Sequence, residues 1–168
     1  MDEKDVLQAM KMPRRAINFV PAQTGETLTM GRGKCRIMED GSRTDNRLGV
    51  AEFTVPSGSH GPPAHWHEMH DETFIVTEGT LRLHAPDGKY VDAKPGDFVT
   101  VPTRAPHTFS NPTDKDVVFI CTFTPAHYIN YFKLMAEMAG EGSRQLTRDE
   151  VLEVMARYAT VPAKEMNS

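Results

Sequence analysis

Cysteine is scarce in this sequence of 168 residues, which contains only Cys35 and Cys121. A disulfide framework needs more cysteines at closer spacing, so we expect two reduced thiols, as in a protein of the cytoplasm. Cys121 lies in an apolar run, where it is expected to pack as a small hydrophobic side chain. We therefore assign both cysteines structural roles.

Long hydrophobic runs and an excess of charge of one sign are also missing. No segment approaches the roughly 18 apolar residues of a membrane-spanning helix, and the acidic start MDEKDVLQAMKMPRR lacks the apolar core of a secretion signal. The net charge is −4, with acidic and basic residues interspersed. We therefore expect no membrane and no nucleic acid as partner, and a small molecule instead.

The chain has no linker, internal repeat or low-complexity tract, which indicates one domain in three regions. These are an N-terminal arm at 1–26, a β-rich region at 27–124 and two helices at 125–168. In the β-rich region short apolar runs alternate with Gly, Pro, Asp and Asn, which is typical of an antiparallel barrel or sandwich. The run DVVFICTFTP is almost continuously apolar, which predicts a strand buried on both faces.

Helical periodicity replaces the strand pattern after Thr124. The first helix is predicted to have Thr124 as its cap and Pro125 as its first residue, and to end before Gly140. The second begins at Thr147, where Thr147 and Glu150 match a capping box. We expect the two helices to cover an edge or an open end of the barrel rather than to form a functional lid.

Histidine and carboxylate side chains are concentrated in HWHEMHDE, residues 65–72. Residues i and i+2 of a strand face the same side, about 6.6 Å apart, so His65 and His67 can converge on one metal ion. Glu72 follows at the next bend or strand start. A further ligand should come from a distant segment, and His107 in VPTRAPHTFSN is the best candidate. A polar barrel mouth without metal is the alternative.

With these residues in view, the sequence resembles the cupin family. The first cupin motif, G-x5-H-x-H-x3,4-E-x6-G, is matched after its first glycine by His65, His67, Glu72 and Gly79. The second motif, G-x5-P-x-G-x2-H-x3-N, is matched by Gly96, Pro102, His107 and Asn111. Two spaced motifs in the right order are far more specific than a histidine pair.

The chain departs from these motifs at two positions. Ser59 stands where the first glycine is expected, with Gly58 one residue earlier, and Arg104 replaces the glycine of the second motif. A non-glycine residue is strained at positive φ, which leaves the conformation of the turn before His107 open. Arg104 could bind an anionic substrate group at the barrel rim, but we expect an exposed turn residue.

The resemblance implies an all-β fold, the double-stranded β-helix of a jelly-roll barrel, with the two C-terminal α-helices packed on it. It also implies one divalent metal ion per chain, which could be Fe, Ni, Co, Mn or Zn, held by His65, His67, Glu72 and His107. Three imidazoles and one carboxylate would leave two positions of an octahedral ion for substrate or dioxygen. A homodimer is a further implication, and because cupins commonly exchange terminal strands, the N-terminal arm is a candidate for that exchange.

Among cupins the chain looks most like the quercetin 2,3-dioxygenase-like proteins, in which helices follow the barrel after a segment like TFTPAHYINYF. That similarity implies dioxygenation of a hydrophobic aromatic or enolic molecule, with Glu72 as both ligand and catalytic base. A redox-neutral isomerase, dehydratase or cyclase of polyketide-like molecules is the first alternative. A small-molecule-binding cupin without catalysis is the second.

The other conspicuous side chains are expected to be structural or solvated. His60 and His70 are assigned to solvated loops, with a place beside the metal as the alternative, and His84 to the surface. We expect His127 to pack, and Glu68 and Asp71 to belong to a polar loop. Five aromatic side chains are predicted to face inward, mainly as core: Phe53, Phe74, Phe109, Phe119 and Phe123.

Overall fold

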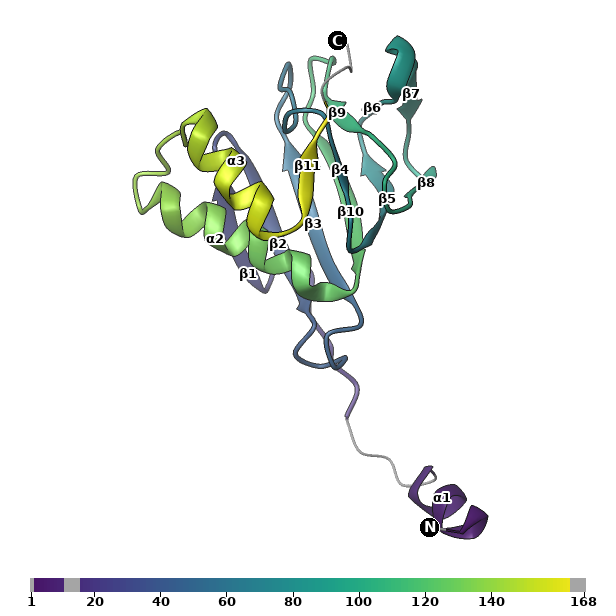
Figure 1. Cartoon of the computed structure of the whole chain (residues 1–168). Coiled ribbons are helices and arrows are strands. Elements are labelled where there is room, and N and C mark those ends of the chain that lie inside the picture. The colour runs from purple at the N-terminus through teal and green to yellow at the C-terminus, as the bar shows by residue number, and fades with distance from the viewer. Residues whose placement is uncertain (1, 11–15, 164–168) are drawn as a thin grey trace.

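A computed structural model describes residues 2–10 and 16–163, and β-strands form the body of that part of the chain (Figure 1). The strands are β1 Glu26–Met30, β2 Gly33–Asp40, β3 Gly49–Val55, β4 His65–His67, β5 Asp71–Glu78, β6 Leu81–His84, β7 Tyr90–Ala93, β8 Phe98–Val101, β9 Thr108–Ser110, β10 Val117–Thr124 and β11 Thr160–Pro162. The helices are α1 Glu3–Met10, α2 Ile129–Ala139 and α3 Arg148–Arg157, with 3-10 turns at Pro86–Gly88 and Ala126–Tyr128.

The strands pair into a six-stranded sheet in the order β1-β2-β3-β10-β5-β8, a three-stranded sheet in the order β7-β6-β9, and the short pair β11-β4. Every pairing is antiparallel. Strands distant in sequence become neighbours, as where β10 lies between β3 and β5, which is the connectivity of a jelly roll rather than of simple hairpins. The expected all-β barrel with C-terminal helices is confirmed.

The central strand β10 does not have two buried faces. Its side chains alternate between buried (Val117, Phe119, Cys121, Phe123) and half-buried (Val118, Ile120, Thr122). The prediction from the continuous apolar run is therefore wrong. The face toward the barrel interior is buried and the other face is half-buried, where its β-branched residues suit a pleated surface.

Aromatic rings fill the interior next to β10. Phe119 packs against Phe53, Phe74 and Phe109 at centroid distances of 5.3, 5.5 and 5.5 Å. Such offset and edge contacts add to the hydrophobic stabilisation of the core. Phe53 and Phe109 are only partly buried but lie against the core, and Phe123 is buried in it, so the five phenylalanines face inward as expected.

Both cysteines are buried free thiols, as expected. Cys35 on β2 is fully enclosed, and this burial raises its pKa to about 12. Cys121 on β10 faces the interior and its pKa is likewise raised by burial. The thiols therefore stay protonated at neutral pH and pack as apolar groups.

The first C-terminal helix begins later than the sequence suggested. Thr124 is the last residue of β10, where it pairs with Asp71, and this strand pairing prevents it from capping a helix. The 3-10 turn Ala126–Tyr128 intervenes, and α2 starts only at Ile129. Gly140 follows the end of α2 as predicted, with a φ of 69°.

The second C-terminal helix has the predicted start. The Thr147 side chain accepts from the Glu150 backbone N–H, and the Glu150 side chain accepts from the Thr147 backbone N–H. α2 and α3 lie side by side next to the β1–β2 end of the large sheet (Figure 1). After α3 the chain forms β11, which pairs with β4, and no pattern in the sequence predicts this strand.

Most described residues of the N-terminal segment are exposed. No residue of α1 is buried, and Ile17 and Phe19 are 95% and 81% exposed. Arm exchange in a homodimer stays a prediction.

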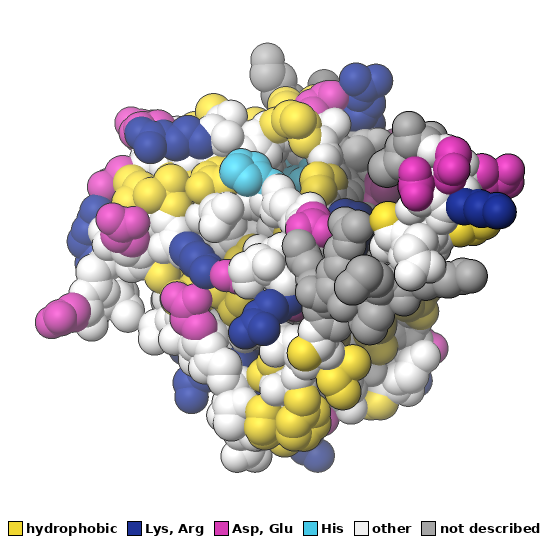
Figure 2. Space-filling view, turned by 90° about the horizontal axis from the view of Figure 1, so that it is seen from below, with side chains coloured by type: hydrophobic (Ala, Val, Ile, Leu, Met, Phe, Trp, Pro, Cys, Tyr) yellow, Lys and Arg dark blue, Asp and Glu magenta, His cyan; other side chains and the backbone are white. Residues whose placement is uncertain are grey.

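On the face seen in Figure 2, acidic and basic side chains are interspersed among hydrophobic ones. In the described ranges 2–10 and 16–163, no helix is long and apolar enough to cross a membrane.

Gly79, between β5 and β6, should be the least replaceable glycine of the two motifs. Its φ is 76°, and a Cβ there would lie 2.6 Å from the Asp116 carbonyl oxygen. Gly88 has a φ of 66° but open space around it. An alanine at Gly88 would therefore have the strain of the left-handed backbone without a steric clash, which makes it the comparison for Gly79. We expect Gly88→Ala to lower the free energy of unfolding by about 1 kcal/mol and Gly79→Ala by more than about 2 kcal/mol. Urea denaturation measures both, and equal losses would contradict the steric argument.

Candidate metal centre

Two strands and one loop bring the predicted ligands together. His65 and His67 point to the same side of β4, with exposures of 5% and 1%. His107 precedes β9 and exchanges two backbone hydrogen bonds with His65, at 3.0 and 2.8 Å. Glu72 comes from β5 and is also buried. The spacing argument for His65 and His67 thus predicts their orientation correctly.

The donor atoms of these four side chains converge. The Nε2 atoms of His65 and His67 lie 3.2 Å apart. Glu72 Oε1 lies 3.4 Å from His67 Nε2, and Glu72 Oε2 lies 3.3 Å from His107 Nε2. The three imidazole donors all fall within 4.8 Å of one another. Such a cluster can hold a metal ion.

The opposite nitrogen of each ring is held from outside the cluster. His65 Nδ1 donates to the Pro63 carbonyl at 2.8 Å, and His107 Nδ1 donates to the Ala105 carbonyl at 3.0 Å. A carbonyl only accepts, so Nδ1 of both rings carries a proton, and the neutral form of either ring has its lone pair on Nε2. This is the tautomer that binds a metal through Nε2. The chemistry of the donor set therefore fits a divalent cation.

Burial and mutual contact set the charges in the cluster. Burial lowers the pKa of His65 to about 3, helped by His107 and His67, and burial also lowers the pKa of His67. For His107, burial acts in the same direction, but the hydrogen bond and charge of Glu72 outweigh it and raise the pKa. Burial alone would raise the pKa of Glu72, yet its histidine contacts hold it well below the usual range. The cluster thus combines a carboxylate with two histidines whose pKa is lowered and one, His107, whose pKa is raised.

His70 is part of the cluster, and its assignment to a solvated loop is wrong. It is only 4% exposed, its Nε2 lies 3.4 Å from Glu72 Oε1, and its ring lies 4.0 Å from that of His67. Tyr128 covers its other side, with ring centroids 4.1 Å apart. His67, His70 and Glu72 form a second group whose donor atoms could hold an ion. His60, by contrast, is exposed as expected.

Thr160 and Tyr128 were missed as site residues. In the β11–β4 pair Thr160 lies opposite His67, and its Oγ1 lies 3.1 Å from His67 Nδ1. The same hydroxyl lies 3.2 Å from the Tyr128 hydroxyl. Thr160 is 3% exposed, so this chain of contacts is shielded from water. The third imidazole is thus oriented by a residue 93 positions further along the chain.

Arg104 is an exposed turn residue, as expected. Its φ is 66°, so the turn before His107 has a left-handed residue even though glycine is replaced. The Arg104 backbone N–H donates to the His67 carbonyl at 2.8 Å, and its side chain pairs with Glu68 at 2.9 Å. The arginine therefore contacts the His67 backbone and the Glu68 side chain. It is not among the residues that line the cavity beside the cluster.

The remaining polar side chains lie outside the cluster. Asp71 is exposed and accepts from the Thr103 backbone N–H at 2.9 Å. His84 is half-buried rather than on the surface, because its Nε2 lies 2.8 Å from the Ser110 hydroxyl. His127 was expected to pack, but it is exposed and has one ring contact, with Tyr158 at 5.5 Å.

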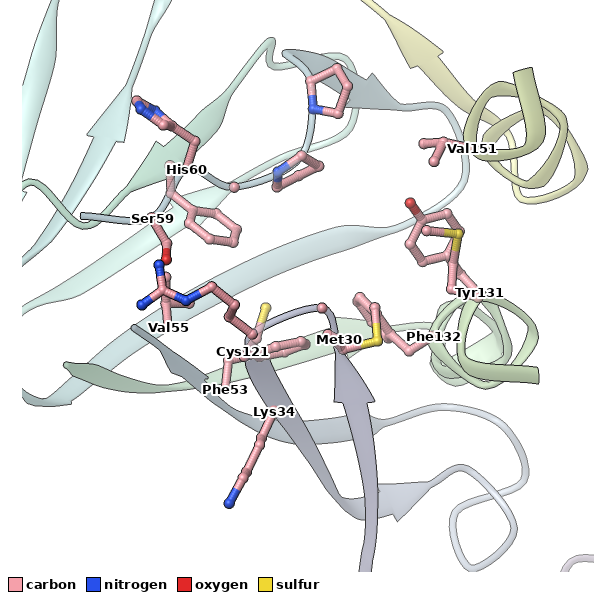
Figure 3. A pocket seen from close by; sticks show the side chains of 18 of the residues that line it. Met30, Lys34, Phe53, Val55, Ser59, His60, Cys121, Tyr131, Phe132 and Val151 are labelled. Carbon is pink, nitrogen blue, oxygen red and sulfur yellow. The ribbon is translucent and has the colours of Figure 1, made fainter. Parts of the chain in front are cut away.

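A cavity of about 540 Å³ adjoins the cluster and is lined by His65, Glu72 and His107. Its walls combine barrel residues with residues of α2 and α3, including Phe53, Phe74, Phe109, Phe119, Phe123, Tyr131, Phe132 and Val151. Figure 3 shows Tyr131 and Val151 on the opposite side of this space from His60 and Ser59, and Phe132 is in ring contact with Phe53 at a centroid distance of 5.1 Å. The volume and the apolar walls suit a small organic molecule.

A family model described as the cupin domain matches residues 51–123. The chain is 31% identical to quercetin 2,3-dioxygenase from Bacillus subtilis (strain 168) over 100 residues, which are 59% of this chain and 29% of that protein. The matched region is thus less than a third of that relative's length. The resemblance seen in the two motifs is confirmed by this match, and the chain has the cupin double-stranded β-helix fold.

Solved structures support the same fold. The polyketide cyclase RemF from Streptomyces resistomycificus has a TM-score of 0.56 at 24% identity, covering 65% of this chain and 80% of that chain. A sugar phosphate isomerase of the cupin superfamily from Silicibacter pomeroyi DSS-3 also has a TM-score of 0.56 at 24% identity, covering 64% and 75%. These likenesses establish the fold alone, since one fold supports several reactions.

Thr160 should be a positioning residue for His67. Thr160→Val keeps the shape of the side chain but removes the oxygen at His67 Nδ1, so we expect the affinity for Co²⁺ or Zn²⁺ to fall about tenfold or more. Thr122→Val is the matched control, because its hydroxyl bonds Thr73 at 2.6 Å on the other face of β10. Competition titration with a chelator and the visible spectrum of bound Co²⁺ measure the effect. Equal affinities in the two variants would show that Thr160 has no such role.

Proposed function

We propose that this chain is a metal-dependent enzyme that acts on a hydrophobic aromatic or enolic molecule, with dioxygen as the second substrate. In this proposal His65, His67, Glu72 and His107 hold one divalent ion, and Glu72 is also the catalytic base. The main support for this proposal is that the histidine–glutamate cluster opens onto a cavity with aromatic walls.

Nitrogen and carboxylate donors of this kind are accepted by iron, nickel, cobalt, manganese and zinc. When bound, such an ion supplies a Lewis acid for a substrate oxygen and, if it is redox-active, a means of activating dioxygen. The dioxygenase assignment draws on the likeness to quercetin 2,3-dioxygenase, whose activity is known for that protein and is inferred for this one.

The chain's own residues have three tasks in this proposal. The phenylalanine walls hold a planar substrate and exclude water. Tyr131 points its hydroxyl into the cavity (Figure 3), and because burial raises its pKa to about 12, it is a neutral donor for a substrate oxygen. Glu72 accepts the proton of the substrate hydroxyl, while the contact from His70 at 3.4 Å restrains one carboxylate oxygen.

Metal removal and restoration test the proposal as a whole. We expect the purified chain to contain about one divalent ion, and flavonols or enolic small molecules to cause oxygen uptake that chelation abolishes and metal restores. Elemental analysis and an oxygen electrode measure this. Turnover without oxygen uptake would indicate an isomerase, dehydratase or cyclase, and binding without turnover a binding protein. Failure to take up any metal would refute the site.

Substitutions separate metal binding from proton transfer. We expect His107→Ala to lose both metal and activity while the fold is kept. Glu72→Gln should retain part of the metal but lower kcat by about 100-fold or more, because the amide cannot accept the proton. His127→Ala, an exposed histidine outside the cavity, is the control and should behave like the wild type. Metal analysis, circular dichroism and turnover are compared, and full activity of Glu72→Gln would exclude it as the base.

A further inference from the structure

The cavity beside the cluster has charged side chains of one sign, apart from Glu72. The other charged residues that line it are Arg32, Lys34 and Arg144, all of them basic. All three side chains are exposed, so each is hydrated in the free protein and can meet an anion that enters the cavity. The question is which of these three cations is available to a substrate.

Two of the three are directed elsewhere. Arg144 makes a bidentate ion pair with Glu150, with N–O distances of 2.9 and 2.7 Å. Lys34 extends its ammonium group away from the cavity in Figure 3. These two cations therefore add little to the recognition of a bound molecule.

Arg32 has no hydrogen bond or ion pair with any residue in the described ranges. Other arginines of the barrel are paired, such as Arg36 with Glu52 at 2.9 Å and Arg82 with Asp92 at 2.7 Å. The five donors of the Arg32 guanidinium are thus available at the edge of an aromatic cavity, and they match an oxyanion in a two-pronged geometry.

The backbone holds Arg32 at this edge. It lies in the two-residue turn between β1 and β2, flanked by Gly31 and Gly33. A Cβ at Gly33 would be 2.7 Å from the Thr54 carbonyl oxygen, so the turn lies directly against the end of β3. A tight turn with a fixed position can present a side chain more reproducibly than a long loop.

We propose that Arg32 binds an oxyanion on the substrate, at the end remote from the hydroxyl that meets Glu72. The substrate class is then an aromatic or enolic compound with a carboxylate group separated from its reactive hydroxyl by an apolar ring system. This inference rests on the proposed function, because it assigns the second end of the same substrate. It adds a charge requirement that the apolar walls alone do not impose.

A pair of ligands that differ only in the carboxylate tests this. The compounds 6-hydroxy-2-naphthoate and 2-naphthol share the ring system and the hydroxyl. We expect the wild-type chain to bind the naphthoate about tenfold more tightly, as measured by calorimetry at low salt. Arg32→Gln should reduce this preference to about one, and Lys34→Gln, two residues further along on β2, should leave it unchanged.

Three outcomes would overturn the proposal. They are an equal affinity of the wild type for both compounds, a preference that survives Arg32→Gln, and no binding of either compound to a folded protein. The titrations are repeated on metal-free protein, where the preference for the naphthoate should persist because the Arg32 guanidinium binds the carboxylate directly. A preference that disappears with the metal but not with Arg32→Gln would place the carboxylate at the cluster instead. An Arg32-dependent preference in a protein that takes up no oxygen with flavonols or enolic molecules would contradict the dioxygenase and still support the anion site.

Discussion

The orientation of the imidazoles depends on hydrogen bonds made outside the cluster. Three ring nitrogens can face one point only if their Nδ1 atoms are held from behind, and here two carbonyls and one hydroxyl do this. The two carbonyls belong to residues two positions before their histidines, Pro63 and Ala105, so these contacts are local. The contact of His67 with Thr160 is long-range, and it requires the complete chain to be folded as far as β11.

This difference explains what the sequence could predict. His65 and His67 follow the two-residue period of a strand, and the spacing of the motifs indicates Glu72 and His107. These four members of the cluster could therefore be predicted from the sequence. His70 was not, because its burial comes from Tyr128, which approaches from the 3-10 turn after β10. A local pattern records the direction of a side chain but carries no information on which distant element will cover it.

The errors in secondary structure have related causes. Thr124 and Pro125 look like a helix start, but the pairing of β10 with β5 continues to Thr124 and takes precedence over the capping preference. β11 has only three residues and includes Pro162, so it shows no period of its own. It exists because β4 offers an edge for pairing, and an edge is a tertiary feature.

The matched cupin region and the rest of the chain contribute differently to the site. All four proposed ligands lie within residues 51–123, whereas Arg32, Tyr131 and Thr160 lie outside that range. Segments outside the match thus supply part of the cavity lining and the support of one imidazole. Likeness within the match therefore bears on the proposed ligands, and it does not extend to these further residues of the site.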